Sequence, residues 1–367
     1  MKVIVNGLDL SNAVLKVSKA ISAKTTNPVL TGIKLSVKGD ELCLSATDME
    51  ISIEKTIKCE TFMEGETVVP GKLFTDFINK LETEDQVELN LSENNQLKIV
   101  YSSSEGFIQT MNPEEFPSIR KDLTKNNFKL LQKDFKDLIN KTVFACSTDD
   151  SRPILKGCLF LIENKSVSAI ALDGFRLAVC KKEIKESTSD LKAIVPARAL
   201  LEITRLLEKD EDSVTVNVQD NNLMIEVDNT ILTTRLLEGE YLNYKQIIPT
   251  AFTTETVIGK TDLLNSLERA AIVAKSTKNL VKFDIKENML NVTANSETGN
   301  VNENVNINLK GKDLVIAFNS KYFTDCLKVI ADETISISFN SAIAPCIITP
   351  VNGGEYLYLI LPIRLNA

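Results

Sequence analysis

Residues 155–201 read LKGCLFLIENKSVSAIALDGFRLAVCKKEIKESTSDLKAIVPARALL, and their pattern determines the architecture. Apolar and polar residues alternate, break at Glu163-Asn164, and alternate again up to Asp173-Gly174. This period of two, interrupted by turn-forming residues, predicts a strand, a turn and a second strand. We expect a third short strand to follow, from Arg176 to Cys180. After it come a polar loop, an apolar run at 194–196 and a helix.

The same pattern occurs three times in the chain. Its strand–turn–strand part starts at Gly32, at Gly157 and at Leu280, so the offset between copies is close to 125 residues. Three further landmarks keep this order: a leading helix (Leu10, Phe135, Leu263), an apolar strand before a second helix (Pro70, Pro196, Phe318) and a final alternating segment (Val87, Val214, Ile335). Alternation alone would not produce a common offset. The repeat therefore predicts three tandem homologous domains.

Each copy is expected to be a β-α-β-β-β-α-β-β-β domain, in which a helix followed by three strands occurs twice. This makes the chain an α+β protein. A length of 367 residues allows two or three domains, and the repeat selects three. We place them at residues 1–122, 123–250 and 251–367.

The composition excludes several classes of protein. Hydrophobic content of 43% and charged content of 25% are ordinary for a globular protein. No apolar run is long enough for a transmembrane helix, and the N-terminus lacks the apolar core of a signal peptide. The seven cysteines are odd in number and show no CxxC spacing, which is typical of a reduced, cytoplasmic protein with buried thiols.

No catalytic or metal site is expected. The chain has no histidine, which removes the commonest general base and zinc ligand. Asp48 and Asp173 occupy equivalent turns, where aspartate bonds to nearby backbone, so we interpret both as structural. Gly259-Lys260-Thr261 resembles the end of a phosphate loop, but Thr254 stands where the first glycine belongs, and Thr261 is better interpreted as a helix cap. We therefore predict a protein that is not an enzyme and holds neither cofactor nor metal.

The charge distribution predicts a polyanionic binding partner. The net charge is −8, yet basic residues outnumber acidic ones in the six expected helical stretches, so the rest of the chain holds the excess acid. If the helices share one surface, that surface is a basic lining suited to sequence-independent contact with a phosphate backbone. No aromatic residue interleaves these basic runs, which favours duplex over single-stranded nucleic acid. The basic residues counted are Lys16, Lys19, Lys24, Lys72, Lys80, Lys133, Lys136, Lys141, Arg198, Arg205, Lys209, Lys260, Arg269, Lys275, Lys321 and Lys328.

With these features the sequence resembles the bacterial DNA polymerase III beta subunits, the sliding clamps, over essentially its whole length. The order and separation of eight short segments carry the resemblance. They are TNPVL (26–30), ATDME (46–50), VVPGKLF (68–74), ALDGFRLAV (171–179), IVPARALLE (194–202), LLEGEYLNYKQIIP (236–249), ERAAIV (268–273) and LPIRL (361–365).

The resemblance implies the DNA-clamp fold and a head-to-tail homodimer. Two three-domain crescents would close a ring, with helices lining the hole and antiparallel sheets forming the outer wall. Ile272 and Val273 would contact the strand around Ile108 across the dimer interface. Lys24, Lys72, Arg152 and Arg198 match the family's DNA-contact positions, although Asp149, Pro153 and Ile154 depart from its pattern beside Arg152.

The resemblance also implies a hydrophobic pocket for short peptide motifs. The expected partners are double-stranded DNA, the polymerase III alpha subunit, the clamp loader delta subunit, and other polymerases and repair proteins. One wall matches Leu155, Leu172, Gly174, Phe175, Arg176, Leu177, Leu242 and Ile247, and the other Asn319, Tyr322, Ile343, Pro345, Leu361, Pro362, Ile363 and Arg364. Leu172, Phe175, Leu242 and Lys278 differ from the usual family residues, and Asn366 and Ala367 extend past the usual end, which predicts a more apolar, differently rimmed pocket.

Two alternatives to a DNA-encircling processivity factor remain at this point. An enzyme of nucleotide chemistry lacks a nucleophile, a metal cluster and a phosphate loop. A scaffold that binds only proteins would not need the basic helices. Retention on circular but not on linear DNA separates the clamp from the scaffold.

Overall fold

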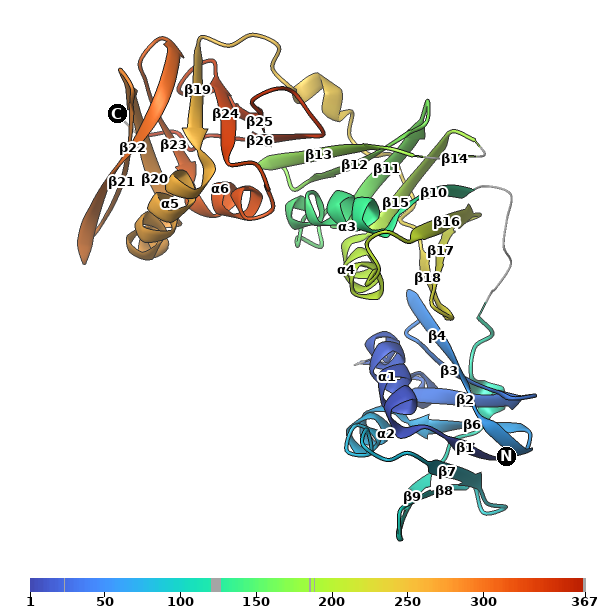
Figure 1. Cartoon of the computed structure of the whole chain (residues 1–367). Coiled ribbons are helices and arrows are strands. Elements are labelled where there is room, and N and C mark those ends of the chain that lie inside the picture. The colour runs from blue at the N-terminus through green and yellow to red at the C-terminus, as the bar shows by residue number, and fades with distance from the viewer. Residues whose placement is uncertain (23, 120–126, 185, 188, 366–367) are drawn as a thin grey trace. The chain divides into compact units, whose positions relative to one another are not determined.

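A computed structural model (Figure 1) describes residues 1–22, 24–119, 127–184, 186–187 and 189–365. The chain forms two compact units. The first contains Met1–Lys129 and Arg205–Leu236, and the second contains Leu130–Thr204 and Leu237–Ala367. The expected boundary at 122–123 and the last two residues, Asn366 and Ala367, lie outside the described residues.

The three copies of the repeat follow one order of elements, except that the first two have an additional short strand ahead of the strand that precedes the second helix. The first has β1 (Lys2–Val5), α1 (Gly7–Val17), β2 (Gly32–Lys38), β3 (Glu41–Thr47), β4 (Ile51–Lys58), β5 (Glu60–Met63), β6 (Gly65–Pro70), α2 (Gly71–Ile78), β7 (Val87–Leu91), β8 (Gln96–Tyr101) and β9 (Ser104–Gln109). The second has β10 (Asn127–Leu131), α3 (Gln132–Asn140), β11 (Gly157–Glu163), β12 (Ser166–Leu172), β13 (Arg176–Glu183), β14 (Glu186–Ser187), β15 (Leu191–Pro196), α4 (Ala197–Leu206), β16 (Ser213–Gln219), β17 (Asn222–Val227) and β18 (Thr230–Arg235). The third has β19 (Thr254–Gly259), α5 (Lys260–Ala274), β20 (Leu280–Lys286), β21 (Met289–Ser296), β22 (Gly299–Gly311), β23 (Leu314–Asn319), α6 (Ser320–Leu327), β24 (Thr334–Phe339), β25 (Cys346–Pro350) and β26 (Tyr356–Ile360).

The predicted element order counts three strands between the two helices of each copy, and the structure adds to them the apolar strand that the sequence places just before the second helix. The apolar run before the second helix forms a fourth strand that returns to pair with the first, as in the register Gly157↔Pro196 between β11 and β15. The third strand is also longer than expected, because β13 continues to Glu183. Lys181 and Glu183, which the sequence pattern assigns to a loop, are exposed and occupy the solvent-facing side of this strand.

The central hairpin of the second copy forms as predicted. Asn164 and Lys165 both have positive φ, 49° and 60°, as a two-residue turn with the twist of the flanking strands requires. Asp173 accepts hydrogen bonds from the backbone N–H groups of Phe175 and Arg176, at 2.9 and 3.0 Å. Asp48 does the same for Glu50 and Ile51. The structural interpretation of both aspartates is thus confirmed.

The helices pack in pairs against the sheets (Figure 1), α1 beside α2 in the first unit and α5 beside α6 in the second. The apolar face of α1 is buried through Leu10, Val14 and Val17. Helix α5 begins earlier than expected: its cap is Gly259, so Thr261 lies inside the first turn and the predicted cap was wrong.

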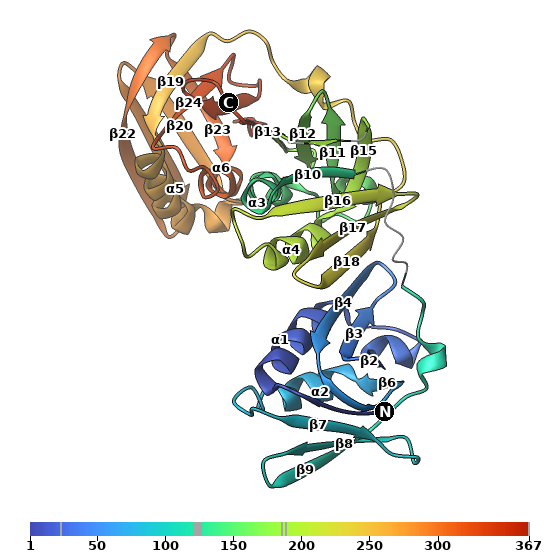
Figure 2. The same ribbon diagram turned by 45° about the vertical axis from the view of Figure 1, so that its right-hand side comes forward.

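Successive copies of the repeat are joined by β-ladders, which explains why the compact units do not coincide with the copies. In the first unit, β18 of the second copy pairs antiparallel with β4 of the first, from Thr230↔Lys55 to Thr234↔Ile51 (Figure 2). In the second unit, β13 pairs with β26 of the third copy, from Arg176↔Ile360 to Cys180↔Tyr356. Backbone hydrogen bonds therefore continue each sheet across the joint between copies.

Candidate functional sites

Arg176, at the start of β13, joins three segments of the second unit. Its guanidinium donates to Asp173 Oδ2 at 3.0 Å, to Asp325 Oδ2 on α6 at 2.7 Å and to the carbonyl of Phe144 at 2.7 Å. Only 9% of the Arg176 side chain is exposed. A guanidinium presents several donors in a rigid plane, so one side chain satisfies partners from both sides of the β13–β26 joint.

Aromatic rings flank this guanidinium. The Phe144 ring lies 5.4 Å from its central carbon and the Tyr322 ring 4.8 Å, within cation–π range. Phe175 stacks on Tyr322 with centroids 6.1 Å apart and planes 17° from parallel. Burial, and then the nearby carboxylate of Asp173, raises the pKa of Tyr322. Phe175 is nevertheless 58% exposed, so it offers an apolar ring to a ligand.

The predicted peptide-pocket residues divide into a buried floor and an exposed rim. Leu155, Leu172 and Leu177 belong to one buried cluster with Tyr241, Ile347 and Leu359. Five large apolar side chains are exposed instead: Phe175, Leu242, Ile247, Ile343 and Leu361. We call these five the candidate docking surface. Exposed apolar groups next to a rigid apolar floor suit the anchors of a short peptide.

The C-terminal segment is held by backbone hydrogen bonds. The N–H of Leu361 donates to the carbonyl of Phe175 at 2.9 Å, and the N–H of Ile363 donates to the carbonyl of Ala317 at 2.8 Å. These bonds place the backbone of Leu361 next to that of Phe175. Pro362, Ile363 and Pro345 are half-buried, Arg364 is exposed, and Gly174 is exposed with φ of 93°.

Asn319 has a structural role that the sequence did not reveal. It is the N-cap of α6, where its side chain accepts a hydrogen bond from the N–H of Lys321. Sequence reasoning also missed Phe144, Tyr241 and Asp325. Their partners are distant in sequence, and only the Lys321–Asp325 spacing of four gave any local signal. Lys278 is exposed, and its backbone adopts the left-handed conformation with φ of 59°.

The four predicted DNA-contact residues are all exposed. Lys24 follows the 3-10 helix η1 (Ser18–Ala20), and Lys72 lies in the first turn of α2. Arg198 lies in the first turn of α4. Arg152 instead precedes the 3-10 helix η5 (Pro153–Lys156), with a guanidinium nitrogen 3.4 Å from the position that a β-carbon on Gly174 would take, so it borders the docking surface.

The excess of basic over acidic residues lies just after the ends of the helices rather than within them. Inside α1 to α6 acidic and basic residues are almost equal in number, so the predicted basic helices were partly wrong. The remaining lysines follow helix C-termini, where the helix dipole favours cations. They include Lys19, Lys80, Lys141, Lys209, Lys275 and Lys328. Several are also ion-paired, as in Lys141–Asp137 and Lys328–Glu268.

The predicted dimer-contact residues differ in exposure. Ile272 is 76% exposed on α5, and Val273 is half-buried. Ile108 is buried, whereas its neighbour Phe107 on β9 is 57% exposed. Any contact with this strand therefore uses the side chain of Phe107 and the strand edge rather than the side chain of Ile108.

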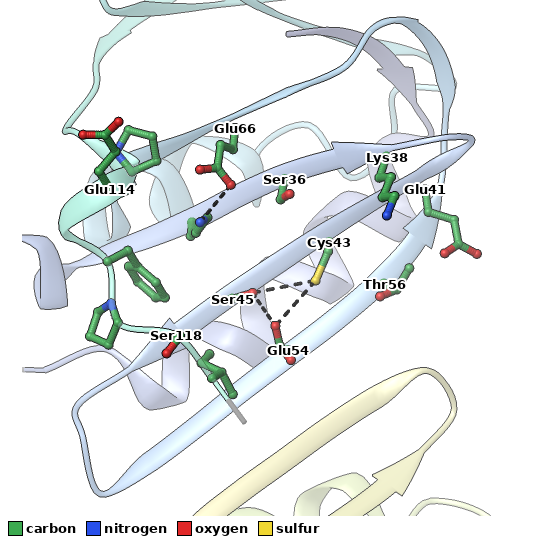
Figure 3. Close-up of a pocket in the computed structure, with 15 residues that line it drawn as sticks. Ser36, Lys38, Glu41, Cys43, Ser45, Glu54, Thr56, Glu66, Glu114 and Ser118 are labelled. Carbon is green, nitrogen blue, oxygen red and sulfur yellow. Dashed lines mark hydrogen bonds and ion pairs between the residues drawn. The ribbon is translucent and has the colours of Figure 1, made fainter. Parts of the chain in front are cut away.

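A polar cavity of about 590 Å³ lies on the β2–β3–β4 face of the first unit (Figure 3). Ser45 donates to Glu54 Oε1 at 3.0 Å on its floor, with the Cys43 thiol 3.9 Å from the same oxygen. Lys34 and Glu66 form an ion pair at 2.8 Å on its wall. Since most of the residues that line it are polar or charged, the cavity does not resemble a site for an apolar peptide.

All seven cysteines are free, and five are buried. Burial raises the pKa of the Cys158 thiol to about 12, so it stays protonated and behaves as a small apolar group. In the described part of the chain, no three acidic or cysteine side chains gather as a metal site would require. No described helix is long and apolar enough to cross a membrane.

Three tandem α+β domains, joined by continuous antiparallel sheets, define a protein of the DNA-clamp fold. The domains of the DNA polymerase III beta subunit match the chain in order: the N-terminal domain at residues 1–120, the central domain at 129–243 and the C-terminal domain at 245–364. The chain belongs to the DNA polymerase III beta subunit family, the bacterial beta sliding clamps. The predicted family and fold class are confirmed.

Relatives and solved structures agree with this assignment. Beta sliding clamps of Staphylococcus epidermidis and Halalkalibacterium halodurans are 32% and 33% identical to the chain, with 94% and 95% of both sequences covered. The DNA polymerase sliding clamp of Bacillus subtilis superposes with a TM-score of 0.96 at 28% identity, over 100% of both chains. The DNA polymerase III beta subunit of Thermotoga maritima gives 0.92 at 30% identity, also over 100% of both chains. The function is that of a sliding clamp, and the DNA-independent scaffold is not favoured.

Proposed function

We propose that two copies of this chain close head to tail into a ring around duplex DNA. Two open strand edges carry the proposal. In the first unit, β9 ends its sheet and pairs only with β8 among the described strands. In the second unit, β22 pairs with β21 over its first half, and β19 reaches it only from Ile307 onward. An open edge is a template for another strand, and a head-to-tail dimer would cover both.

Exposed apolar side chains accompany both edges. Phe107 lies on β9 itself. Helix α5 lies against β22, where Arg269 pairs with Glu303. Ile272 follows Arg269 by three residues and so lies on the same side of the helix. Edge pairing flanked by apolar contacts would hold the dimer while leaving an interface that a loader can open.

We expect Ile272→Glu to convert the dimer into single chains, because a charge would then be buried in an apolar contact. Size-exclusion chromatography with light scattering should give the mass of two chains for the unaltered protein and of one for the variant. Met289→Glu, at an exposed position on β21, is the matched control and should remain dimeric. A single-chain mass for the unaltered protein would contradict the ring.

We propose that Lys24, Lys72, Arg152 and Arg198 contact the enclosed duplex through its phosphates. Encirclement keeps the ring on DNA, so each contact can be weak enough to permit sliding. Such contacts weaken as salt rises, because binding releases counterions from the duplex.

Neutralising Lys24, Lys72 and Arg198 together should slow loading onto nicked circular DNA and increase its salt sensitivity, without changing the fold. Loading rate and retention on gel-filtered circles measure this, with circular dichroism for the fold. A variant lacking Lys38, Lys310 and Lys312, all exposed residues of strands or their ends, removes the same charge and should load normally. Equal behaviour of the two triple variants would refute the assignment.

We further propose that the docking surface takes short apolar motifs of the polymerase III alpha subunit, the clamp loader delta subunit, and other polymerases and repair proteins. The protein would act in the cytoplasm as a non-catalytic accessory protein, with domains at residues 1–122, 123–250 and 251–367. The exposed aromatic and aliphatic rim beside a buried floor supports the docking role. Retention on circular but not on linearised DNA distinguishes this function from that of a scaffold.

A further inference from the structure

The chain contains two Asn-Gly pairs, Asn6-Gly7 and Asn352-Gly353, and the structure treats them differently. Asn-Gly is the dipeptide most prone to deamidation, because glycine lacks a β-carbon to hinder the attack of its backbone nitrogen on the asparagine side chain. Both asparagines are exposed, so exposure alone does not distinguish them. What differs is how firmly the two reacting groups are held.

Asn6-Gly7 is held at both reacting groups. Asn6 is the N-cap of α1, and its Oδ1 accepts a hydrogen bond from the N–H of Asp9 at 3.1 Å. Its Nδ2 adds only a long 3.4 Å contact to the carbonyl of Asp85. The N–H of Gly7 donates to the carbonyl of Glu84 at 3.0 Å, and Gly7 is buried. The attacking nitrogen and the side chain therefore cannot meet without opening the first turn of α1.

Asn352-Gly353 lies in the exposed turn between β25 and β26. The N–H of Gly353 has only a long 3.4 Å contact to the carbonyl of Pro350, beyond the usual range of a strong N–H···O bond. Gly353 has φ of 73°, and nothing lies within 4 Å of where its β-carbon would stand. No hydrogen bond of the Asn352 side chain is seen among the described residues. The nitrogen and the side chain are thus free to approach.

We propose that Asn352 is a site of spontaneous deamidation in the folded protein and that Asn6 is not. The deprotonated backbone nitrogen of Gly353 attacks Cγ of Asn352, a C–N bond forms, and the side-chain nitrogen leaves as ammonia. Water then opens the resulting five-membered imide at either carbonyl, giving aspartate or isoaspartate. No oxidant or enzyme is needed, and the rate rises with pH because the attacking nitrogen must lose its proton.

The turn that contains Asn352 lies next to an ion pair between β13 and the residue before β26. Glu355 follows three residues after Asn352; its carboxylate pairs with Lys182, and its carbonyl accepts the N–H of Lys181. Deamidation adds a second carboxylate beside this pair, and isoaspartate also inserts one extra backbone carbon between β25 and β26. The product is a more acidic form of the clamp, altered in the turn that leads into β26 and so to the β13–β26 ladder. It accumulates as the protein ages.

Peptide mapping by mass spectrometry tests the proposal on the intact dimer, incubated at neutral and at mildly alkaline pH. The peptide with Asn352 should gain the mass of an amide-to-acid change and become a substrate for isoaspartyl methyltransferase, faster at the higher pH. The peptide with Asn6 should stay unchanged. In denaturant both peptides should react at similar rates, since the sequence pair is the same.

Two variants sharpen the test. Gly353→His keeps a residue type that tolerates positive φ and adds a β-carbon without creating a new Asn-Gly pair before Gly354, so it should slow the reaction strongly while the fold is retained. Asn6→Asp keeps a capping carboxylate, removes the control amide and should leave the Asn352 rate unchanged. The proposal is overturned if native Asn352 stays intact, or if native Asn6 reacts as fast as Asn352.

Discussion

Replacing Arg176 by methionine should lower the free energy of unfolding of the second unit by about 3 kcal/mol or more, the usual consequence of removing one partner from a buried ion pair. Methionine keeps much of the apolar stem but none of the donors. Asp173 and Asp325, only 14% and 21% exposed, would lose their shared cation, and the carbonyl of Phe144 would lose its donor. The rings of Phe144 and Tyr322 would lose the group between them.

Hydrogen exchange gives the clearest measurement, because a chain of three repeats does not unfold in a single two-state step. Protection of β13 and β26 should fall in Arg176→Met, while β1 and β7 in the first unit keep theirs. Lys321→Met removes the other cation beside Asp325, but the Lys321 side chain is 61% exposed, so its loss should cost less than about 1 kcal/mol. Equal effects of the two variants would show that Arg176 does not hold the joint.

Arg176→Lys should resemble the methionine variant more than the unaltered protein. One ammonium cannot reproduce a planar fork that serves two carboxylates and a carbonyl, or its stacking between two rings. This comparison separates geometry from charge, because both side chains carry one positive charge.

The repeat and the turns could be predicted from sequence, because both depend on short-range patterns. Alternation, turn residues and a constant offset are local signals, and Asp48 and Asp173 bond to backbone within three residues. The Arg176 junction could not be predicted, because Arg176 and Asp325 are 149 residues apart and only the folded joint brings them together.

The partly wrong prediction of basic helices has a physical cause too. Counting charge along helical stretches mixes residues of the helix with those after its end, so lysines such as Lys19 and Lys328 are assigned to a lining when they follow helix C-termini. The pocket prediction rests on resemblance and groups residues of different exposure. The sequence could not separate Leu155, which is 2% exposed, from Leu361, which is 37% exposed.

That difference in exposure determines how docking should be tested. Leu155→Ala would leave a cavity in the buried cluster and cost about 2–5 kcal/mol of stability, so any loss of binding would be ambiguous. Leu361→Asp and Leu242→Asp alter exposed side chains of the docking surface instead. Each should weaken binding of a fluorescent peptide that carries the apolar clamp-binding motif of a polymerase by about tenfold or more, the loss of about 1.4 kcal/mol of apolar contact.

Deletion of residues 361–367 should abolish measurable binding of the same peptide, because it removes Leu361 together with the backbone bonds to Phe175 and Ala317. Val351→Asp is the matched control: Val351 is 42% exposed, in the same unit, on the β25–β26 turn. It introduces the same charge outside the docking surface and should bind normally. Fluorescence anisotropy on dimeric protein measures all four variants. Full affinity in both Leu361→Asp and the deletion would place the peptide elsewhere, whereas equal weakening by Val351→Asp would show a general effect of charge rather than a docking surface.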